Sequence, residues 1–484
     1  MFHTGRVVVM PVKVTVGAQL TITDPTPEIK EYCESNLVIR NPKYYQLQRM
    51  GKWVGNEPKE IYLYDIETKP ELITYVLPFG CLNDIWSLVR DPNVFDLTYK
   101  KSEPIEYEEL IKLRDYQEPI PYIVADKKNG IVIAPCGSGK TVTGLVSIAR
   151  LKKKTLWITH TVDLLNQSRT AAMEALGLHG NQIGTITAGK CRIGTHITFA
   201  TVQTLSKMPD LEQLADEFDM IVVDECHRCC INAKSVGMFQ KALSIFNCRY
   251  KIGLTATAHR SDGLIQGMFA MLGPVIYEVP KEAVKENTVH VNISFRLTNY
   301  DYSDYVLDTD GTIVFGKLVD DIALDQERNQ QIADDLILNS DHYNLILSDR
   351  IFHLHMLMDM LPEQSAAAII DSKTPKTKRE ETLKDIKAGK YHYLFATYQL
   401  AKEGLDIPRL DRLYMALPKK DYAVVIQSVG RIARAFADKK NAICYDYVDD
   451  IGLCRKMYHE RLKSYRKQGY QTNMIVLGGK KNVV

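Results

Sequence analysis

The sequence predicts an α/β protein in which two tandem, doubly wound parallel sheets follow a small α+β N-terminal domain. Two series of short apolar runs, separated by segments of helix length, carry this prediction, because such runs are typical of parallel strands joined by crossover helices. The first series comprises residues 131–134, 155–159, 197–200, 220–223 and 252–255. The second series comprises residues 345–347, 367–370, 393–396, 413–416 and 442–445.

Three domains are expected along the 484 residues. Residues 1–110 form the N-terminal domain, residues 111–284 the first sheet domain, and residues 285–484 the second sheet domain with a basic tail. The polar connection 280–287 is the expected hinge. Because the chemical motifs described below all lie beyond residue 110, we expect the two sheet domains to fold without the first.

A phosphate-binding loop follows the first predicted strand, in the run Ala134-Pro-Cys-Gly-Ser-Gly-Lys-Thr141. Gly137 and Gly139 permit a tight turn that points backbone amides at phosphate oxygens, although the strict pattern begins with glycine rather than alanine. The lysine is expected to reach the β/γ phosphates and the threonine hydroxyl to hold Mg²⁺. The cofactor-binding residues expected in this loop are Pro135, Cys136, Gly137, Ser138, Gly139, Lys140 and Thr141.

An acidic pair ends a later strand, in the run Met220-Ile-Val-Val-Asp-Glu225. We expect Asp224 to hold Mg²⁺ and Glu225 to orient and deprotonate the attacking water. A lone pair of carboxylates is usually a solvated strand end. Downstream of a phosphate loop, by the length of a few strand–helix units, the pair indicates catalysis instead.

Two arginines lie three positions apart in the run Gln427-Ser-Val-Gly-Arg431-Ile-Ala-Arg434. On a helix they would share one face, where they can stabilise charge that develops on a γ-phosphate. They lie too far along the chain to share one small domain with Lys140, so the sequence predicts ATP and Mg²⁺ bound between two lobes. The expected catalytic residues are Lys140, Asp224, Glu225, Gln427, Arg431 and Arg434.

These three motifs, in this order, resemble the superfamily 2 helicases and translocases, whose motor consists of two RecA-like domains. Other motifs of that family match here between residues 113 and 450. The resemblance assigns adenine recognition to the segment with Arg114 and Gln117, strand contacts to Thr161, Thr201 and Thr397, and a further nucleotide contact to Gly404 and Asp406.

Within this superfamily, the Leu113-Arg-Asp-Tyr-Gln117 motif and the string from Thr255 to Gly263 resemble the group that contains XPB and phage UvsW. The stretch from Asn41 to Gly80 is similar to the start of UvsW-type phage proteins. The resemblance implies ATP, Mg²⁺ and a phage source. It also implies a DNA helicase or translocase that remodels branched DNA by fork regression, branch migration or strand annealing in recombination and repair.

Three other functions stay open. The chain could be a double-stranded DNA translocase of a restriction or defence complex, although no nuclease motif is present, or an RNA or transcript-release motor. It could also be an ATP-gated nucleic-acid-binding switch that does not translocate. Stimulation of ATP hydrolysis by different nucleic acids distinguishes these alternatives.

The net charge of +2 provides no general attraction for DNA, so contacts must come from local basic patches. One candidate patch intersperses basic with aromatic side chains, a mixture able to pair with phosphates and stack on bases. The alternative is a strand pair with an aromatic core and solvated basic residues. The expected nucleic-acid contacts in this patch are Arg40, Lys43, Arg49, Lys52 and Trp53.

The remaining features are less specific. The segment 298–321, which turns at residues 308–311, is expected to be a surface hairpin or loop, and the basic tail 455–481 is either a solvated closing helix or a phosphate-contacting edge. Ten cysteines without zinc-site spacing indicate reduced thiols rather than structural zinc. No signal peptide or membrane-spanning run is present, which leads us to expect an intracellular, cytoplasmic protein without a membrane partner.

Overall fold

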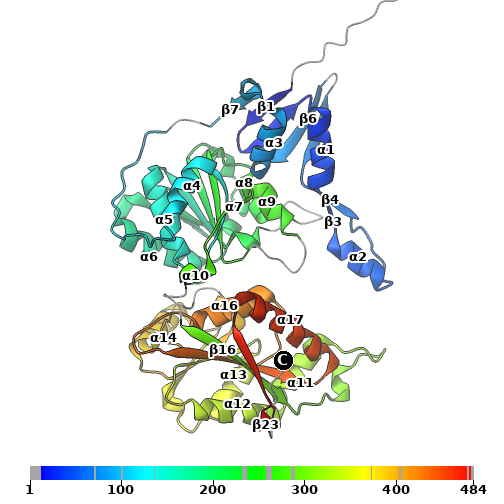
Figure 1. Ribbon diagram of the computed structural model, residues 1–484, viewed down its shortest axis with the longest axis vertical. Coiled ribbons are helices and arrows are strands. Elements are labelled where there is room, and N and C mark those ends of the chain that lie inside the picture. Colours follow the sequence, from blue (N-terminus) through cyan, green and yellow to red (C-terminus); the bar gives the residue numbers. More distant parts are fainter. Residues whose placement is uncertain are drawn as a thin grey trace, which may run out of the picture. The chain divides into compact units, whose positions relative to one another are not determined.

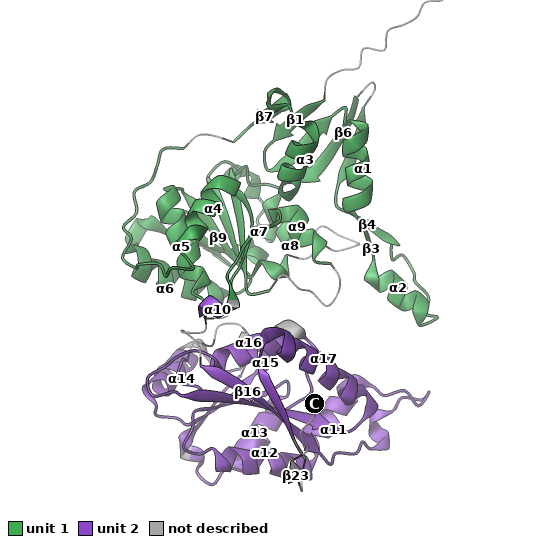
Figure 2. Cartoon of the chain, viewed as in Figure 1, with its two compact units in different colours: residues 1–280 green, residues 281–484 purple. Residues whose placement is uncertain are grey.

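The computed structural model describes residues 12–69, 72–99, 102–135, 137–229, 231, 237–257, 264–284, 289–371, 373–402, 405, 407–476 and 479–480. The chain divides into two compact units, unit 1 at residues 1–280 and unit 2 at residues 281–484 (Figure 2). The division falls within the polar connection expected to be the hinge. No separate division appears near residue 110, because the N-terminal elements belong to unit 1.

Unit 1 begins with a five-stranded, largely antiparallel sheet in the order β5-β6-β2-β1-β7. In β1 and β2, buried side chains alternate with more exposed ones, as expected for a sheet with one covered face. Helices α1 and α3 accompany it, and Pro27 at the first position of α1 follows the capping residue Thr26. The bounds are β1 Lys13–Val16, β2 Gln19–Thr23, β5 Asp65–Lys69, β6 Leu72–Pro78, β7 Phe95–Leu97, α1 Pro27–Asn36 and α3 Leu82–Val89.

An arm, defined here as residues 38–62, projects from this sheet (Figure 1). It consists of the antiparallel pair β3 (Val38–Arg40) and β4 (Glu60–Tyr62) with helix α2 (Pro42–Arg49) between them. Asn41 caps α2, and none of the residues of this helix is buried. The arm is therefore a small extension that presents most of its side chains to solvent.

The second sheet of unit 1 has eight strands in the order β11-β10-β12-β9-β13-β14-β8-β15, all parallel except β11. Its strands are β8 Asn129–Ile133, β9 Thr155–Thr159, β10 Ile183–Thr187, β11 Lys190–Arg192, β12 Ile197–Thr201, β13 Met220–Asp224, β14 Tyr250–Thr255 and β15 Val275–Glu278. Its helices are α4 Pro119–Lys127, α5 Lys140–Leu151, α6 Val162–Leu176, α7 Val202–Lys207, α8 Met238–Leu243 and α9 Gln266–Leu272.

The two sheets of unit 1 share one continuous apolar core. Gly80 lies so close to α9 that a Cβ there would collide with the Ala270 carbonyl oxygen. Lys251, a fully buried lysine of β14, donates hydrogen bonds to the carbonyl oxygens of Ala18 at 2.7 Å and Leu243 at 3.1 Å. Independent folding of the sheet domains without residues 1–110 stays a prediction, and it must contend with the loss of part of this core and of the Ala18 contact of Lys251.

Unit 2 contains an eight-stranded sheet in the order β18-β19-β17-β20-β21-β16-β22-β23, parallel except for β23. Its strands are β16 His290–Thr298, β17 Asn344–Ser348, β18 Ala367–Ile370, β19 Tyr393–Thr397, β20 Arg412–Met415, β21 Asn441–Asp449, β22 Gln471–Val476 and β23 Gly479–Lys480. Its helices are α10 Lys281–Val284, α11 Phe315–Leu324, α12 Gln326–Leu338, α13 Ile351–Asp359, α14 Lys376–Ala388, α15 Tyr398–Lys402, α16 Tyr422–Ile432 and α17 Gly452–Gln468.

The predicted fold class is confirmed, and all ten predicted strands are present within a few residues of their expected bounds. Segment 298–321 contains a single antiparallel bridge, between Leu307 and Ile313, and then continues into α11, a helix that was not expected. In the tail, α17 buries Tyr458, Arg461 and Tyr465 and is therefore only partly solvated.

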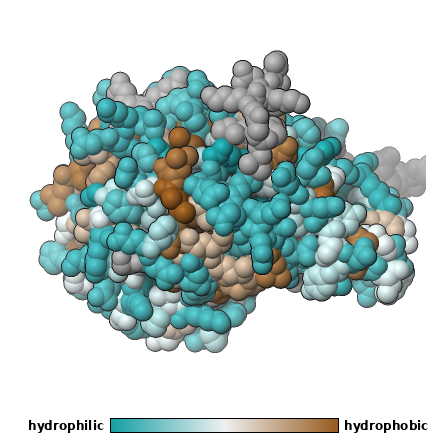
Figure 3. Space-filling view, turned by 90° about the horizontal axis from the view of Figure 1, so that it is seen from below, coloured by the Kyte–Doolittle hydropathy of each residue, from teal (hydrophilic) through white to brown (hydrophobic). Residues whose placement is uncertain are grey.

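The visible face of the space-filling view is covered mostly by hydrophilic residues, and hydrophobic ones occur in separate groups (Figure 3). Within the described residues, no helix combines the length and apolar character needed to cross a membrane.

Candidate functional site

The phosphate loop lies between β8 and α5, where the sequence placed it. Gly137 and Gly139 have φ values of +83° and +76°, a left-handed conformation that residues with a Cβ seldom adopt. The loop is tied to the sheet by the Ala134 amide, which donates to the Thr255 carbonyl oxygen at 2.8 Å. Lys140 and Thr141 occupy the first turn of α5, whose amide end favours an anion.

Gln117 holds the backbone of this loop through its side chain. Its buried side chain donates from Nε2 to the Ser138 carbonyl oxygen at 2.8 Å, and its Oε1 accepts from the Arg114 amide at 2.9 Å. A Cβ on Gly139 would lie 2.7 Å from the same Nε2. Tyr116 adds a hydrogen bond from its hydroxyl to the Ser138 carbonyl oxygen at 3.1 Å. The glutamine expected to contact adenine therefore also fixes the backbone of the phosphate loop.

The acidic pair lies at the carboxyl end of β13. Asp224 is 3% exposed, and Glu225 has a φ of +52°, a left-handed conformation that is costly for a residue other than glycine. Glu225 forms an ion pair with Lys140 and lies 3.2 Å from His227 Nδ1. His227 Nδ1 also lies 3.0 Å from Thr255 Oγ1. Side chains from separate segments of the chain thus meet at one edge of the sheet.

The two carboxyls differ in their proton affinity. Burial, the strongest influence, raises the pKa of Asp224 to about 6, against the opposing attraction of Lys140. Burial also acts to raise the pKa of Glu225, but Lys140 and His227 outweigh it and hold this pKa below its usual range. Glu225 is therefore ionised at neutral pH, as a group that accepts a proton must be.

The three threonines expected to contact a nucleic-acid strand all lie next to the carboxyl ends of parallel strands. Thr161 caps α6 by accepting from the Leu164 amide at 3.3 Å, and Thr397 accepts from the Leu400 amide at 3.4 Å. Thr201 is buried, and its hydroxyl lies 2.9 Å from that of Thr204. The structure thus gives Thr201 a contact within the protein, and its contact with a nucleic-acid strand stays a prediction.

One connection between these segments was missed at the sequence level. Gln203 Nε2 lies 2.7 Å from the His160 carbonyl oxygen and 2.9 Å from the His160 Nδ1 atom. This contact joins the segments of Thr161 and Thr201. Hydrophobic patterning contains no signal for this contact, because both of its side chains are polar.

In unit 2, Gln427 is buried in α16, and Arg431 lies near the end of that helix. Arg431 donates from Nε to the Ala401 carbonyl oxygen at 2.8 Å and from Nη1 to the Leu405 carbonyl oxygen at 3.2 Å. Because α16 ends at Ile432, Arg434 lies beyond it, so the prediction of two arginines on one helical face is wrong.

Three predicted positions lie outside the described residues, Cys136, Gly404 and Asp406, as do residues 258–263 of the string from Thr255 to Gly263.

The basic and aromatic patch lies on the arm. Trp53 is 88% exposed, and Arg40, Lys43, Arg49 and Lys52 are exposed as well. Lys43 forms an ion pair with Glu57. The alternative prediction of an aromatic core at this position is wrong for Trp53, which the arm presents to solvent.

The residues of unit 1 fit a nucleotide with a divalent metal. The left-handed φ angles of Gly137 and Gly139 allow the backbone amides of the loop to point at an anion. The Ser138 hydroxyl is buried without a hydrogen-bond partner among the described residues. Asp224 and Thr141 provide the oxygen ligands that Mg²⁺ prefers.

Two family models match the chain: "Type III restriction enzyme, res subunit" over residues 110–260 and "Helicase conserved C-terminal domain" over residues 328–436. Together they cover more than half of it. Probable helicase D10 of Escherichia phage T5 is 26% identical over 366 residues, which are 75% of this chain and 76% of that protein. DNA 3'-5' translocase XPB2 of Sulfurisphaera tokodaii is 24% identical over 380 residues, 70% of this chain and 82% of that protein.

Among solved structures, S. cerevisiae Dbp5 bound to RNA and ADP BeF3 has a TM-score of 0.54 at 13% identity, over 76% of this chain and 90% of that one. This likeness shows the fold, two tandem RecA-like domains. The helicase families imply ATP with a divalent metal as cofactors and nucleic acid as partner. The chain belongs to the superfamily 2 helicases and translocases, with XPB-type and viral helicases among its relatives, and is an ATP-dependent enzyme that acts on nucleic acid.

Proposed function

We propose that this protein is an ATP-driven DNA motor that remodels branched DNA, by fork regression, branch migration or strand annealing, in recombination and repair. We choose branched DNA as the substrate because the arm presents an exposed tryptophan among basic side chains. Such a surface suits phosphate contacts combined with stacking on an unpaired base at a junction. The name of the XPB2 relative, a DNA 3'-5' translocase, supports DNA as the substrate.

In the proposed hydrolysis step, the backbone amides of the phosphate loop and Lys140 bind the β and γ phosphates. Mg²⁺, held by Asp224 and Thr141, would neutralise charge on these phosphates. Because Lys140 also forms an ion pair with Glu225, phosphate binding would draw the lysine away from that carboxylate. Glu225 then accepts a proton from the attacking water, and His227 keeps it oriented.

Gln117 would contact adenine. Because its side chain also donates a hydrogen bond to the phosphate loop, adenine binding would influence how the loop holds the phosphates. Gln427, Arg431 and Arg434 are proposed to act from the second domain, with Arg434 stabilising the charge that develops on the γ-phosphate. The Arg431 side chain holds two carbonyl groups of segment 401–405, so we assign it mainly to positioning that segment. Gly404 belongs to this segment and Asp406 follows it directly in the sequence, and both are proposed nucleotide contacts.

DNA is proposed to be held at its phosphates by the segments of Thr161, Thr201 and Thr397. Contacts of this kind carry little sequence information, as a motor requires. Because His160 and Gln203 connect the segments of Thr161 and Thr201, we expect these two segments to move together during the cycle of ATP binding and hydrolysis.

A branch-migration assay tests the proposal. A four-way junction with one labelled strand is incubated with protein, ATP and Mg²⁺, and the released duplex is measured. We expect ATP-dependent conversion by the wild type and none by Glu225→Gln, which retains ATP binding. Conversion without ATP, or none under any condition while ATP is hydrolysed, would contradict junction remodelling.

A parallel assay with an RNA–DNA hybrid examines the RNA-motor alternative. Faster displacement of RNA than of DNA would favour it. ATP-dependent binding without displacement of any strand would indicate a switch that does not translocate.

A further inference from the structure

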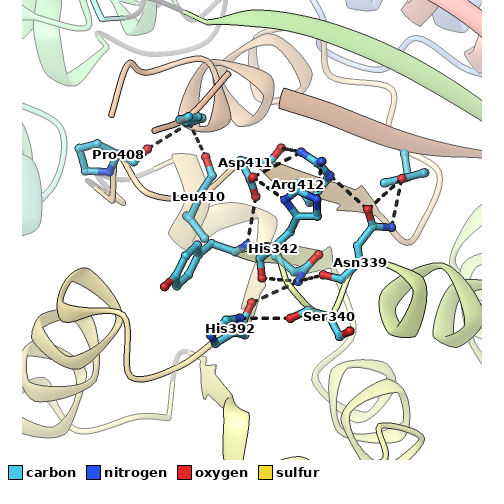
Figure 4. A network of polar contacts seen from close by, with 12 residues as sticks. Asn339, Ser340, His342, His392, Pro408, Leu410, Asp411 and Arg412 are labelled. Atoms are coloured by element: carbon cyan, nitrogen blue, oxygen red, sulfur yellow. Dashed lines mark hydrogen bonds and ion pairs between the residues drawn. The ribbon is translucent and has the colours of Figure 1, made fainter. Parts of the chain in front are cut away.

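Lys439 of unit 2 belongs to none of the motifs recognised in the sequence. Each donor of its ammonium group has a hydrogen-bond acceptor. Lys439 Nζ donates to three carbonyl oxygens, those of Pro408 at 3.0 Å, Leu410 at 2.5 Å and Arg434 at 2.9 Å. An ammonium group has three donors, so these contacts satisfy it fully. Figure 4 shows Pro408 and Leu410, two of these acceptors, turned toward the same side chain.

The backbone places Lys439 at this point. Beyond α16, Asp438 adopts a left-handed φ of +64°, and the Lys439 amide closes a turn on the Phe436 carbonyl oxygen at 3.1 Å. A lysine near the end of a helix commonly binds the last carbonyl groups of that helix. Here the lysine binds the Arg434 carbonyl oxygen just beyond α16 and also a second segment, so it joins the stretch after α16 to residues 408–410.

A second contact fixes the same two segments independently. The Arg409 guanidinium lies 4.9 Å from the Phe436 ring centre and 4.7 Å from that of Tyr343, and it donates to the Tyr343 hydroxyl at 2.8 Å. The neighbouring Asp411 accepts from His342 at 2.8 Å (Figure 4). Residues 408–411 are thus held by several contacts, and the apolar residues Leu405, Ile407 and Leu410 are buried.

We propose that Lys439 is a positioning residue for ATP hydrolysis, which holds the backbone of Arg434 and segment 407–410 in one arrangement. The proposal rests on the role proposed above for Arg434. Because Arg434 lies beyond the last turn of α16, helical hydrogen bonding does not fix its backbone. The contact from Lys439 ties the Arg434 carbonyl oxygen, at a position that also lies in an isolated β-bridge, to residues 408–410. A catalytic group displaced by about 1 Å can lose roughly 100-fold in rate.

The charges around Lys439 make the effect sensitive to pH. Burial, the largest influence, lowers the pKa of Lys439 to about 8, with Arg434 and Arg412 acting in the same direction and Asp411 opposing them. Above this pH the group loses its charge and grips the carbonyl oxygens less strongly. We therefore expect kcat to fall as pH rises beyond about 8 and this fall to move to higher pH in Lys439→Arg, since arginine stays charged.

The test compares steady-state ATP hydrolysis by the full chain with saturating duplex DNA. Lys439→Met should lower kcat by about 10- to 100-fold while KM for ATP changes little, because substrate binding does not depend on the positioned arginine. Lys439→Arg should recover part of the loss. Lys440→Met, a change at the exposed neighbouring lysine, is the matched control and should keep the wild-type kcat.

A double variant separates positioning from a general loss of structure. If Lys439 acts through Arg434, Lys439→Met should add little to the loss caused by Arg434→Ala. Full additivity, or a wild-type kcat in folded Lys439→Met, would overturn the role of Lys439. Where Lys439→Met does not fold, Lys439→Gln serves instead and should show the same fall in kcat. Full activity of Arg434→Ala would count against the function proposed for that arginine, which is a separate failure.

Discussion

The two units use their charged residues in different ways. In unit 1, Lys140, Glu225, His227 and Thr255 contact one another side chain to side chain at one edge of the sheet. In unit 2, Arg431 and Lys439 instead donate hydrogen bonds to backbone carbonyl oxygens, those of Ala401, Leu405, Pro408 and Leu410. The comparison supports the proposal that Lys140 and Glu225 of unit 1 act directly on the nucleotide, whereas Arg431 and Lys439 of unit 2 position the segments around the proposed catalytic residue Arg434.

The largest expected effect lies in unit 1. Lys140→Ala should abolish ATP hydrolysis and weaken nucleotide binding, because the loop then has no side-chain cation for the phosphates among the described residues of 134–141. Glu225→Gln should bind ATP yet hydrolyse it orders of magnitude more slowly, because the amide cannot accept the proton of the attacking water. Phosphate release and binding of a fluorescent ATP analogue check the two variants. Substantial turnover by purified Glu225→Gln would remove that residue from its proposed role.

The difference between the units also explains what could be predicted from the sequence. Chemical motifs are dense at strand ends, so the phosphate loop and the acidic pair were located together with the strands that carry them. Strand β16, in the interior of the second sheet, carries no motif and was missed. The contacts of Lys251 and Lys439 join segments that are distant in the chain or depend on a single left-handed turn, and hydrophobic periodicity contains no information about either.

A second prediction compares the two arginines of unit 2. Arg434→Ala should lower kcat with little change in melting temperature, because its proposed role is in the transition state. Arg431→Ala should lower both kcat and stability, since two carbonyl groups lose a charged donor and each such hydrogen bond is worth about 2 kcal/mol. Thermal unfolding and steady-state kinetics of both variants provide the comparison. Equal decreases in stability would show that the two arginines do not differ in this way.

A third prediction concerns Lys251, the buried lysine that joins the two sheets of unit 1. Burial, its dominant influence, lowers the pKa of Lys251 to about 8, whereas an unfolded lysine has a pKa of about 10.4. Between these values the unfolded chain binds more protons, so this lysine makes the free energy of unfolding rise with pH, by about 3 kcal/mol in all. The stability of the wild type relative to Lys251→Met should therefore increase from about pH 8 to about pH 10. Denaturant unfolding at both values measures it, and a constant difference would refute a shifted lysine.

The smallest expected change is in the salt dependence of DNA binding. If Arg40, Arg49 and Lys52 on the arm each neutralise a phosphate, removing their charges should reduce the slope of log affinity against log salt by roughly one unit per residue. Lys43 should contribute less, because it already pairs with Glu57. The matched control replaces the exposed lysines 378, 384 and 387 of α14. An equal change of slope in the control would show that the arm has no special part in binding.

Whether this chain is a DNA motor directed to branched substrates can be decided from the rate of ATP hydrolysis with different nucleic acids. Wild-type protein and Trp53→Ala are compared with a four-way junction, a linear duplex of the same sequence and single-stranded RNA, at equal nucleotide concentration and fixed salt. We expect the strongest stimulation by the junction and a selective loss of that preference in Trp53→Ala. Equal stimulation by junction and linear duplex, or stronger stimulation by RNA, would contradict a motor for branched DNA.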